Sequence, residues 1–256
     1  MKRVHLFEIE DQTWCPLLFR NLITDWLQFA AKTFQLYDGV VPLIQKVLLE
    51  TSSRQIIDLC SGSSGPWSHL ASQTKGISIL LTDKYPNIEA FRRISRKSGG
   101  QIGFISYSVD ATNVPPHLIG MRTIFTGFHH FRPEMAKAIL QNSVKCRSAI
   151  GIFEFTERRL QNCTSTLISI PILVWKKTPF IRPLKFSRIF WTYCVPIAPL
   201  LIMWDGLVSH LRTYSVVELE ELISTIDNGG YNWELGQYRH PSSGIPVTYL
   251  LGYPVD

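Results

Sequence analysis

The sequence has no Cys-x-x-Cys pair, and its cysteines are few and odd in number. A disulfide-stapled fold or a structural zinc site needs cysteines paired at short spacing. We therefore predict neither of these, and no other metal-ligand spacing is apparent. Five scattered cysteines are typical of a protein kept in a reducing compartment. They are Cys15, Cys60, Cys146, Cys163 and Cys194.

Charged residues are also scarce, at 18% against 45% hydrophobic residues, which excludes an intrinsically disordered chain. The net charge of +6 is too mild to identify a partner. Residues 1–11 carry acids where a secretory signal has an apolar run, so we expect a cytoplasmic protein. The length of 256 residues allows one α/β domain with an additional lobe.

Two apolar strands that end near acids are the most informative feature of the chain. The first, residues 56–59, contains Asp58 and leads into a loop of small residues, 60–65; the second, residues 77–83, ends at Asp83. Strands of this kind, with room for one helix between them, predict a βαβ unit that binds a nucleoside. Asp83 is placed to accept hydrogen bonds from ribose hydroxyls. We therefore expect an enzyme.

The small-residue loop differs from the loop of a dinucleotide site. The pattern G-x-G-x-x-G rests a pyrophosphate on a helix N-terminus, but here only Gly62 and Gly65 remain, and Cys60 takes the first position. Asp58, just before the loop, faces a pyrophosphate unfavourably. The same carboxylate suits a ligand that carries an ammonium group and a sulfonium.

At these residues the chain resembles the class I S-adenosylmethionine-dependent methyltransferases, whose first motif reads apolar-apolar-Asp-x-Gly-x-Gly-x-Gly. Cys60 replaces the first Gly, Gly62 holds the second, and Ser64 stands at the third. The resemblance implies an α/β, Rossmann-like fold with a mostly parallel seven-stranded sheet and an antiparallel last strand. It also implies S-adenosyl-L-methionine as the cofactor, with the loop under its methionine part and Asp83 on its ribose.

Residues downstream extend the resemblance in the same order along the chain. Asp110-Ala111 follow a short strand, where the family places an acid that accepts from the adenine amino group. Residues 123–131 read as a fourth strand running into a turn toward the cofactor, and residues 149–155 as a fifth. The implied cofactor-binding residues are Asp58, Cys60, Ser61, Gly62, Ser63, Asp83, Lys84, Asp110, Ala111 and Gly127. A doubly wound domain without a cofactor remains the alternative.

Helices are expected at residues 66–74, 88–98 and 133–145. In the C-terminal part, residues 215–226 carry a Ser cap, a Glu three residues on and apolar residues at helical spacing. Asn228-Gly229-Gly230 ends this helix, and residues 231–239 and 245–253 read as two strands joined at 241–244. We therefore expect the sheet core to comprise residues 56–155 and 215–256.

The N-terminal region, residues 1–55, is expected to form a helical cap with helices at 16–34 and 40–50. The segment before the first helix is rich in acids and aromatics. One interpretation is a solvated entry strand. The other is a lid that places Glu10, Asp11 or Trp14 in the substrate pocket.

Residues 156–214 form a longer connection than the resembling family needs between the fifth strand and the last helix. They contain two uncharged runs, 160–175 and 189–204, separated by five basic residues and no acid. Neither run reaches the roughly 20 apolar residues of a spanning helix, although a transmembrane hairpin stays open. A helical cap over the pocket and a cap that also meets a membrane surface are the other readings. Each reading predicts an acceptor that is at least partly apolar.

Methyl transfer from a sulfonium is an in-line displacement, so positioning can supply much of the catalysis. A base is needed when the acceptor carries a proton that must leave. His129 and His130, after the fourth strand, are candidates for it, as is Glu154 at the end of the fifth. Packing and helix capping are the structural alternatives for the histidines. Arg158 is a candidate contact for an acidic acceptor.

The elements Phe128-His129-His130-Phe131 and Trp204-Asp205-Gly206 resemble those of uncharacterised bacterial methyltransferase-like proteins. This resemblance identifies no acceptor; we expect methyl transfer to a small molecule or lipid, at an oxygen or nitrogen. Two alternatives stay open: a membrane-surface enzyme that modifies lipids, and a non-catalytic protein that binds S-adenosylmethionine. Nucleic acid is not expected, because the basic residues lie beside apolar runs rather than among stacking aromatics.

Overall fold

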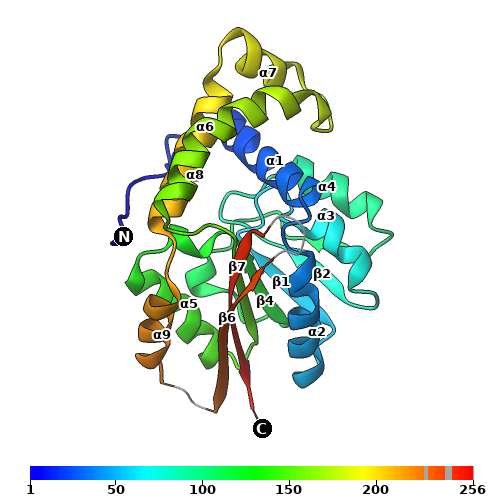
Figure 1. Cartoon of the computed structure of the whole chain (residues 1–256). Coiled ribbons are helices and arrows are strands. Elements are labelled where there is room, and N and C mark those ends of the chain that lie inside the picture. The colour runs from blue at the N-terminus through cyan, green and yellow to red at the C-terminus, as the bar shows by residue number, and fades with distance from the viewer. Residues whose placement is uncertain (228–229, 240–243, 256) are drawn as a thin grey trace.

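The computed structural model describes residues 1–227, 230–239 and 244–255. At its centre is a seven-stranded sheet of order β3-β2-β1-β4-β5-β7-β6 (Figure 1). Strands β1 to β5 are parallel, and β7 lies antiparallel between β5 and β6. The predicted sheet is therefore confirmed. The strands are β1 (Gln55–Leu59), β2 (Ser78–Leu81), β3 (Ile102–Phe104), β4 (Met121–Phe125), β5 (Ile150–Glu154), β6 (Tyr231–Arg239) and β7 (Pro246–Pro254).

The central strands are buried on both faces, as their apolar runs predict. Every residue of β4 and β5 is buried, because helices cover the sheet from both sides. Short helices and turns pack on one face against side chains such as Phe91 and Phe153. On this face lie η1 (Asp38–Val40), α2 (Val41–Glu50), α3 (Trp67–Leu70), η2 (Ala71–Gln73) and α4 (Ile88–Lys97).

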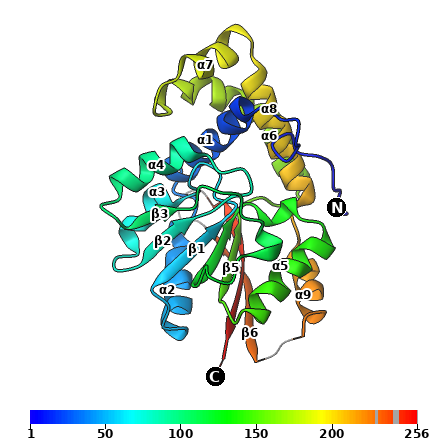
Figure 2. The same cartoon turned by 180° about the vertical axis from the view of Figure 1, so that it is seen from behind.

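The opposite face is covered by α5 and α9 (Figure 2) and carries a second apolar cluster that includes Ile139 and Leu222. Its helix α9 begins with a capping box, in which Ser215 and Glu218 each accept from the other's backbone N–H. This face holds η3 (Ala111–Asn113), η4 (Phe128–His130), α5 (Pro133–Lys145) and α9 (Val216–Ser224).

A helical lobe lies beyond the carboxyl ends of the parallel strands (Figures 1 and 2). Two long helices, α6 and α8, pack on each other, and α1 lies between them and the sheet domain. A third apolar cluster, with Trp26 from α1 and Val174 and Ile202 from the lobe, fills this junction. The elements are α1 (Leu17–Thr33), α6 (Leu160–Lys177), η5 (Thr178–Phe180), α7 (Phe186–Ile189), η6 (Phe190–Cys194, a π-helix) and α8 (Ile197–Arg212).

The two uncharged runs of this lobe are thus helical, as the cap interpretation predicts. Among the described residues, no single helix is long and apolar enough to cross a bilayer. Two consecutive helical segments, Phe186–Cys194 and Ile197–Arg212, are together long and apolar enough to cross a bilayer, but they are bent by 84° relative to each other.

Element boundaries agree with the predicted ones to within a few residues. Two predicted helices, however, are divided into shorter elements. The helix expected at 66–74 is the short α3 followed by η2. The second uncharged run is broken near Pro196, where the π-helix η6 ends and α8 begins. The predicted stops at 228–229 and the turn at 241–243 lie outside the described residues.

Candidate cofactor and acceptor site

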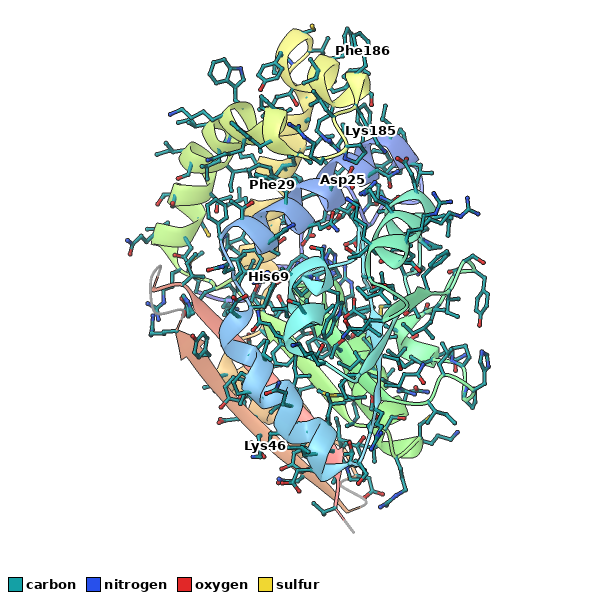
Figure 3. The ribbon with its side chains drawn as sticks, turned by 90° about the vertical axis from the view of Figure 1, so that its right-hand side faces the viewer. Asp25, Phe29, Lys46, His69, Lys185 and Phe186 are labelled. Carbon is teal, nitrogen blue, oxygen red and sulfur yellow. The ribbon has the colours of Figure 1, made fainter. Side chains whose placement is uncertain are left out.

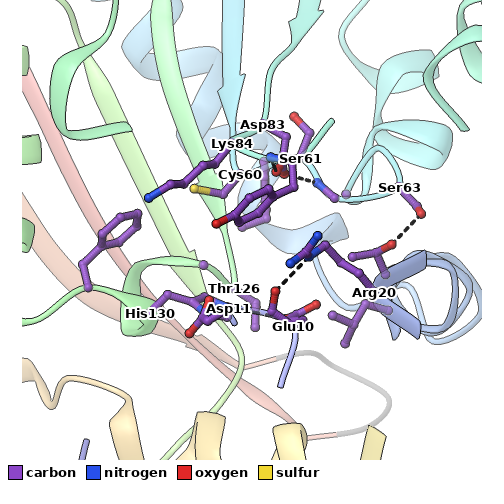
Figure 4. A pocket seen from close by; sticks show the side chains of 18 of the residues that line it. Glu10, Asp11, Arg20, Cys60, Ser61, Ser63, Asp83, Lys84, Thr126 and His130 are labelled. Atoms are coloured by element: carbon purple, nitrogen blue, oxygen red, sulfur yellow. Dashed lines mark hydrogen bonds and ion pairs between the residues drawn. The ribbon is translucent and has the colours of Figure 1, made fainter. Parts of the chain in front are cut away.

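A cavity of about 460 Å³ opens at the carboxyl ends of β1, β2 and β4. This volume is within the usual range of small-molecule sites. Figure 4 shows its two walls: Cys60, Ser61, Asp83 and Lys84 from the strand ends on one side, and Glu10, Asp11 and His130 on the other. The cavity therefore lies where an open α/β sheet places its ligands.

The loop after β1 forms part of the first wall in an unusual backbone conformation. Cys60 has φ 57° and Gly62 has φ 54°, the left-handed region that side chains disfavour. A Cβ added at Gly62 would lie 3.2 Å from Thr24 Cγ2 of α1, so the loop passes close to that helix. Any other residue there would crowd the Thr24 side chain and adopt a strained φ, so glycine is favoured.

The loop is fixed by hydrogen bonds from three directions. Ser61 N–H donates to the Thr82 carbonyl at 3.0 Å, tying the loop to the end of β2. Ser63 Oγ donates to Asp25 Oδ1 of α1 at 2.8 Å and accepts from Asn87 Nδ2 at 3.0 Å. These contacts hold the backbone of the cavity wall in place before any ligand binds.

Asp83 stands at the end of β2, where the sequence predicts the ribose contact. Its carboxylate accepts from Gly62 N–H and from Tyr85 N–H, both at 2.7 Å. The side chain lines the cavity and is only partly buried. Burial raises its pKa, and the two backbone donors act in the opposite direction. Each oxygen retains a lone pair that can accept from a ligand hydroxyl.

Gly127 continues the wall after β4. A Cβ at this position would lie 3.2 Å from Cys60 Cβ, so the two strand ends approach closely here. The preceding residue, Thr126, has φ 43°, a second left-handed non-glycine residue that lines the cavity. Strained backbone of this kind is concentrated at functional sites.

The opposite wall comes from the N-terminal segment, which is fixed by a carboxylate of the lobe. Asp205 of α8 accepts from Ile9 N–H at 2.7 Å and from Glu10 N–H at 3.1 Å. Arg20 of α1 donates to the carbonyls of Glu10 and Gln12 at 2.9 and 2.8 Å. The lid interpretation of this segment thus agrees with the structure for Glu10 and Asp11, which line the cavity.

His129 and His130 have different surroundings although they are adjacent. His129 is buried, and its Nδ1 lies 2.8 Å from Glu154 Oε2. Glu154 also accepts from the backbone N–H of Phe128 at 2.7 Å. His130 lines the cavity, and its Nδ1 lies 2.8 Å from Asp11 Oδ1. Although burial opposes it, the nearby Asp11 and Glu8 carboxylates raise the pKa of His130 to about 10.

Solved structures share this arrangement of sheet and helices. The plantazolicin methyltransferase BpumL, in complex with a pentazolic desmethylPZN analog and SAH, matches with a TM-score of 0.55 and 13% identity over 93% of this chain and 97% of that one. The methyltransferase domain of bacterial CtHen1 matches with a TM-score of 0.53 and 13% identity over 86% and 100%. The chain has the class I methyltransferase fold.

A third match is an O-methyltransferase family protein from Burkholderia thailandensis, with a TM-score of 0.51, 14% identity and 91% of this chain covered. The chain spans 60% of that protein's length, and 59% of a Nostoc punctiforme protein with a TM-score of 0.50. No protein-family model matches the chain, and no curated protein matches it. At these identities the comparisons show the methyltransferase fold.

The position of Asp58 in this methyltransferase fold differs from the one predicted from the sequence. It was expected to face the cofactor, but it does not line the cavity. Its oxygens accept from Ser61 Oγ at 2.6 Å and Thr123 Oγ1 at 2.7 Å, beneath the loop. Burial raises its pKa to about 7. Asp58 therefore shapes the loop from below.

Asp110 and Ala111 also lie outside the cavity lining. Asp110 caps the turn η3 by accepting from Thr112 N–H at 2.9 Å, and its carboxylate lies 3.8 Å from Lys84 Nζ. Its Oδ1 is thus held by its own turn, and the adenine contact of Asp110 stays a prediction.

Two predicted substrate contacts are displaced further. Arg158 forms an ion pair with Glu218 at the start of α9 and does not line the cavity. Trp14 is exposed on the N-terminal segment and is also absent from the cavity wall. Residue type alone does not tell a substrate contact from a structural one at these positions, because Arg and Trp are common in both.

His129 and Glu154, which the sequence offers as catalytic groups, lie behind the wall rather than in it. They position the turn that carries His130, since Glu154 accepts from two backbone N–H groups of that turn. The structure also adds Glu8 and Arg212, which the sequence analysis missed. Arg212 donates to Asp11 Oδ2 at 2.7 Å and to the His130 carbonyl at 2.5 Å.

Proposed function

We propose that this chain is an S-adenosylmethionine-dependent methyltransferase. The observation that carries the proposal is the pairing of the left-handed loop at Cys60 and Gly62 with the carboxylate of Asp83, both on one cavity wall. The shared fold supports it, as does the presence of SAH in the BpumL complex.

Asp83 is the residue we assign to the cofactor's ribose hydroxyls, because it keeps free lone pairs toward the cavity. The backbone of residues 60–62 and Gly127 would lie against the rest of the cofactor, where a larger side chain has no room. When bound, S-adenosylmethionine supplies a methyl group on a positively charged sulfur. The protein's part is to orient the acceptor and exclude water.

The acceptor would occupy the opposite side of the cavity. Apolar side chains, including Leu27, Met135 and Phe155, contribute to the lining, which supports an acceptor that is small and at least partly apolar. Among the polar groups of the lining, those of Glu10, Asp11 and His130 belong to the N-terminal segment and the turn after β4. We therefore assign acceptor orientation to Glu10, Asp11 and His130, which lie together on this wall.

Removal of a proton from an O–H or N–H acceptor is assigned to this group as a unit. Asp11 and His130 are joined by a 2.8 Å contact, and His130 Nε2 lies 3.7 Å from Glu10 Oε1. Because the pKa of His130 is about 10, its ring is charged near neutral pH, and a proton from the acceptor would go to a carboxylate of this group. His129 and Glu154 act through this group and would not touch the acceptor.

The test is transfer of a labelled methyl group. The purified chain, methyl-labelled S-adenosylmethionine and a cell extract are incubated, and products are separated by mass spectrometry. We expect label in a small molecule that partitions into organic solvent. The labelled product should be absent with Asp83→Ala and unchanged with the control Glu50→Ala, which lies at the exposed end of α2. Tight cofactor binding without any labelled product would instead indicate a non-catalytic binding protein.

A further inference from the structure

A buried carboxylate beside the two histidines has no hydrogen bond. Glu8 is fully buried, yet neither of its oxygens has a hydrogen-bond partner among the described residues. His129 Nε2, also buried, has none either. Buried polar atoms of native proteins are almost always satisfied, so two such groups facing each other need an explanation.

The separations between these atoms have the size expected across a bound metal ion. Glu8 Oε1 lies 3.4 Å from His129 Nε2, and Glu8 Oε2 lies 3.4 Å from His130 Nδ1. Ligand atoms at about 2.0–2.1 Å from a tetrahedral ion are about 3.4 Å apart. A direct hydrogen bond would bring nitrogen and oxygen to about 2.9 Å.

We propose that Glu8, His129 and His130 bind a divalent transition-metal ion. Their ligand atoms all lie within 4.8 Å of one another. Asp11 Oδ1 lies 2.8 Å from His130 Nδ1, a hydrogen-bond distance, so it would become a fourth ligand only by releasing this contact. The ligands come from the N-terminal segment and from the turn after β4, which explains why no spacing along the sequence predicts the site.

The surroundings resemble those of a metal site beyond its ligands. The second nitrogen of a ligating histidine usually contacts a carboxylate that fixes the ring, and Glu154 Oε2 occupies this place 2.8 Å from His129 Nδ1. Arg212 Nη1 lies 2.7 Å from Asp11 Oδ2 and 3.2 Å from Glu8 Oε1. Ligating carboxylates are commonly held by such outer donors.

The ligand types define the class of ion. Two imidazoles with one or two carboxylates suit Zn²⁺, Mn²⁺ or Fe²⁺, whereas Mg²⁺ and Ca²⁺ prefer oxygen alone. Charge also balances, because the carboxylates of Glu8, Asp11 and Glu154 offset a divalent ion together with Arg212. Other ionisable groups near the cluster include Arg3, His5, Glu10, Asp83, Asp205 and His210.

The ion would lie in the cavity wall, since Asp11 and His130 line the cavity while Glu8 and His129 lie behind it. It would also anchor the N-terminal segment to the turn after β4. The inference concerns binding of the ion and does not depend on methyl transfer. Its test is therefore independent of the proposed function.

The test uses the full chain, stripped with a chelator and titrated at pH 7 with ZnCl2, MnCl2 and MgCl2 by calorimetry. We expect one Zn²⁺ or Mn²⁺ per chain and at least 100-fold weaker Mg²⁺ binding. Glu8→Gln should abolish the site, while Glu154→Gln, which keeps the shape of the side chain, should weaken it about 10–100-fold. His117→Gln, at an exposed histidine outside the cluster, should leave it unchanged.

A second measurement uses only the wild-type protein, so that the result does not depend on whether a variant folds. Limited proteolysis of the wild-type chain should cut residues 1–15 faster after chelation than with Zn²⁺ restored. The absence of stoichiometric Zn²⁺ or Mn²⁺ binding would overturn the proposal, leaving a metal-free network of ion pairs. Binding that Glu8→Gln and Glu154→Gln do not change would overturn it equally.

Discussion

Arg188 of the helical lobe and Asp25 of α1 form a buried ion pair, with Nη2 and Oδ2 2.5 Å apart. Both side chains are almost fully enclosed, with exposed fractions of 3% and 5%. The other oxygen of Asp25 accepts from Ser63 in the loop after β1. One carboxylate thus joins the lobe to the cavity wall. Lys185 of the lobe also forms an ion pair, with Glu89, so two of the lobe's basic residues contact the rest of the protein.

Replacing Arg188 with Met should destabilise the protein by about 3–5 kcal/mol, because the buried Asp25 carboxylate loses its closest cation and Arg93 remains only at 3.9 Å. It should also weaken binding of S-adenosylhomocysteine, since Ser63 loses a fixed acceptor. Urea unfolding and calorimetry measure the two effects. The matched control is Lys185→Met, whose partner Glu89 is exposed (Figure 3 labels Asp25 and Lys185).

An exposed pair of this kind contributes under about 1 kcal/mol. If Arg188→Met and Lys185→Met proved equally mild, the buried pair would not link the lobe to the loop.

Cys60→Gly should leave the free energy of unfolding within about 1 kcal/mol of the wild type. Glycine adopts φ 57° without strain, and this offsets its greater freedom in the unfolded chain. Cys60→Val should lower the free energy of unfolding clearly more, because a β-branched side chain is strained at positive φ. Denaturant unfolding of both variants makes the comparison. A valine variant as stable as the glycine variant would contradict the left-handed backbone at this position.

Cys60 should react slowly with iodoacetamide even without ligand, because burial raises the pKa of its thiol well above the usual value. Saturating S-adenosylhomocysteine should slow the reaction further, and the alkylated protein should lose cofactor binding. Cys146 and Cys194 are exposed and serve as internal controls in peptide mass spectrometry. Rapid labelling of Cys60 at saturating ligand would place the ligand away from this loop.

Acidification should weaken the junction between the lobe and the sheet through His210. Its Nδ1 accepts from Glu157 N–H at 3.1 Å, and Nε2 lies 3.1 Å from Thr166 Oγ1, so the neutral ring fits its partners. Burial lowers its pKa to about 4. Because the folded pKa is below the unfolded value of about 6.5, this stability is present above pH 6.5 and is lost as pH falls toward 4.

The loss attributed to His210 should be on the order of 1–3 kcal/mol. It is measured by unfolding the wild type and His210→Gln between pH 4 and 8, since Gln can keep one acceptor and one donor. The variant should lose less stability than the wild type in this interval. Equal losses in the two proteins would show that His210 does not titrate as described.

The sheet could be predicted because each strand is an apolar run with its own end signal. Asp83 and Gly62 were placed correctly on the cavity wall for the same reason: the carboxyl ends of parallel strands meet at one edge. Asp58 shows where this reasoning stops. Position along a strand does not say on which side of the loop a carboxylate turns, and here Ser61 and Thr123 hold it beneath.

Contacts between distant segments could not be predicted at all. Glu8, His129 and Arg212 belong to three separate regions of the sequence and meet only because the N-terminal segment crosses α8. Nothing in the sequence around Arg212 distinguishes a packing role from the ion pairs that it makes with Glu8 and Asp11. Arg158 was misplaced for the same reason, because its partner Glu218 lies in the last helix.

The central claim is that the cavity binds S-adenosylmethionine through Asp83. The most direct measurement is calorimetry of S-adenosylhomocysteine with the wild type, Asp83→Ala and the control Glu50→Ala, and of NAD with the wild type. We predict one site per chain, a loss of about 1–3 kcal/mol with Asp83→Ala, no change with Glu50→Ala and far weaker binding of NAD. Equal affinity for NAD, or no effect of Asp83→Ala, would contradict the account.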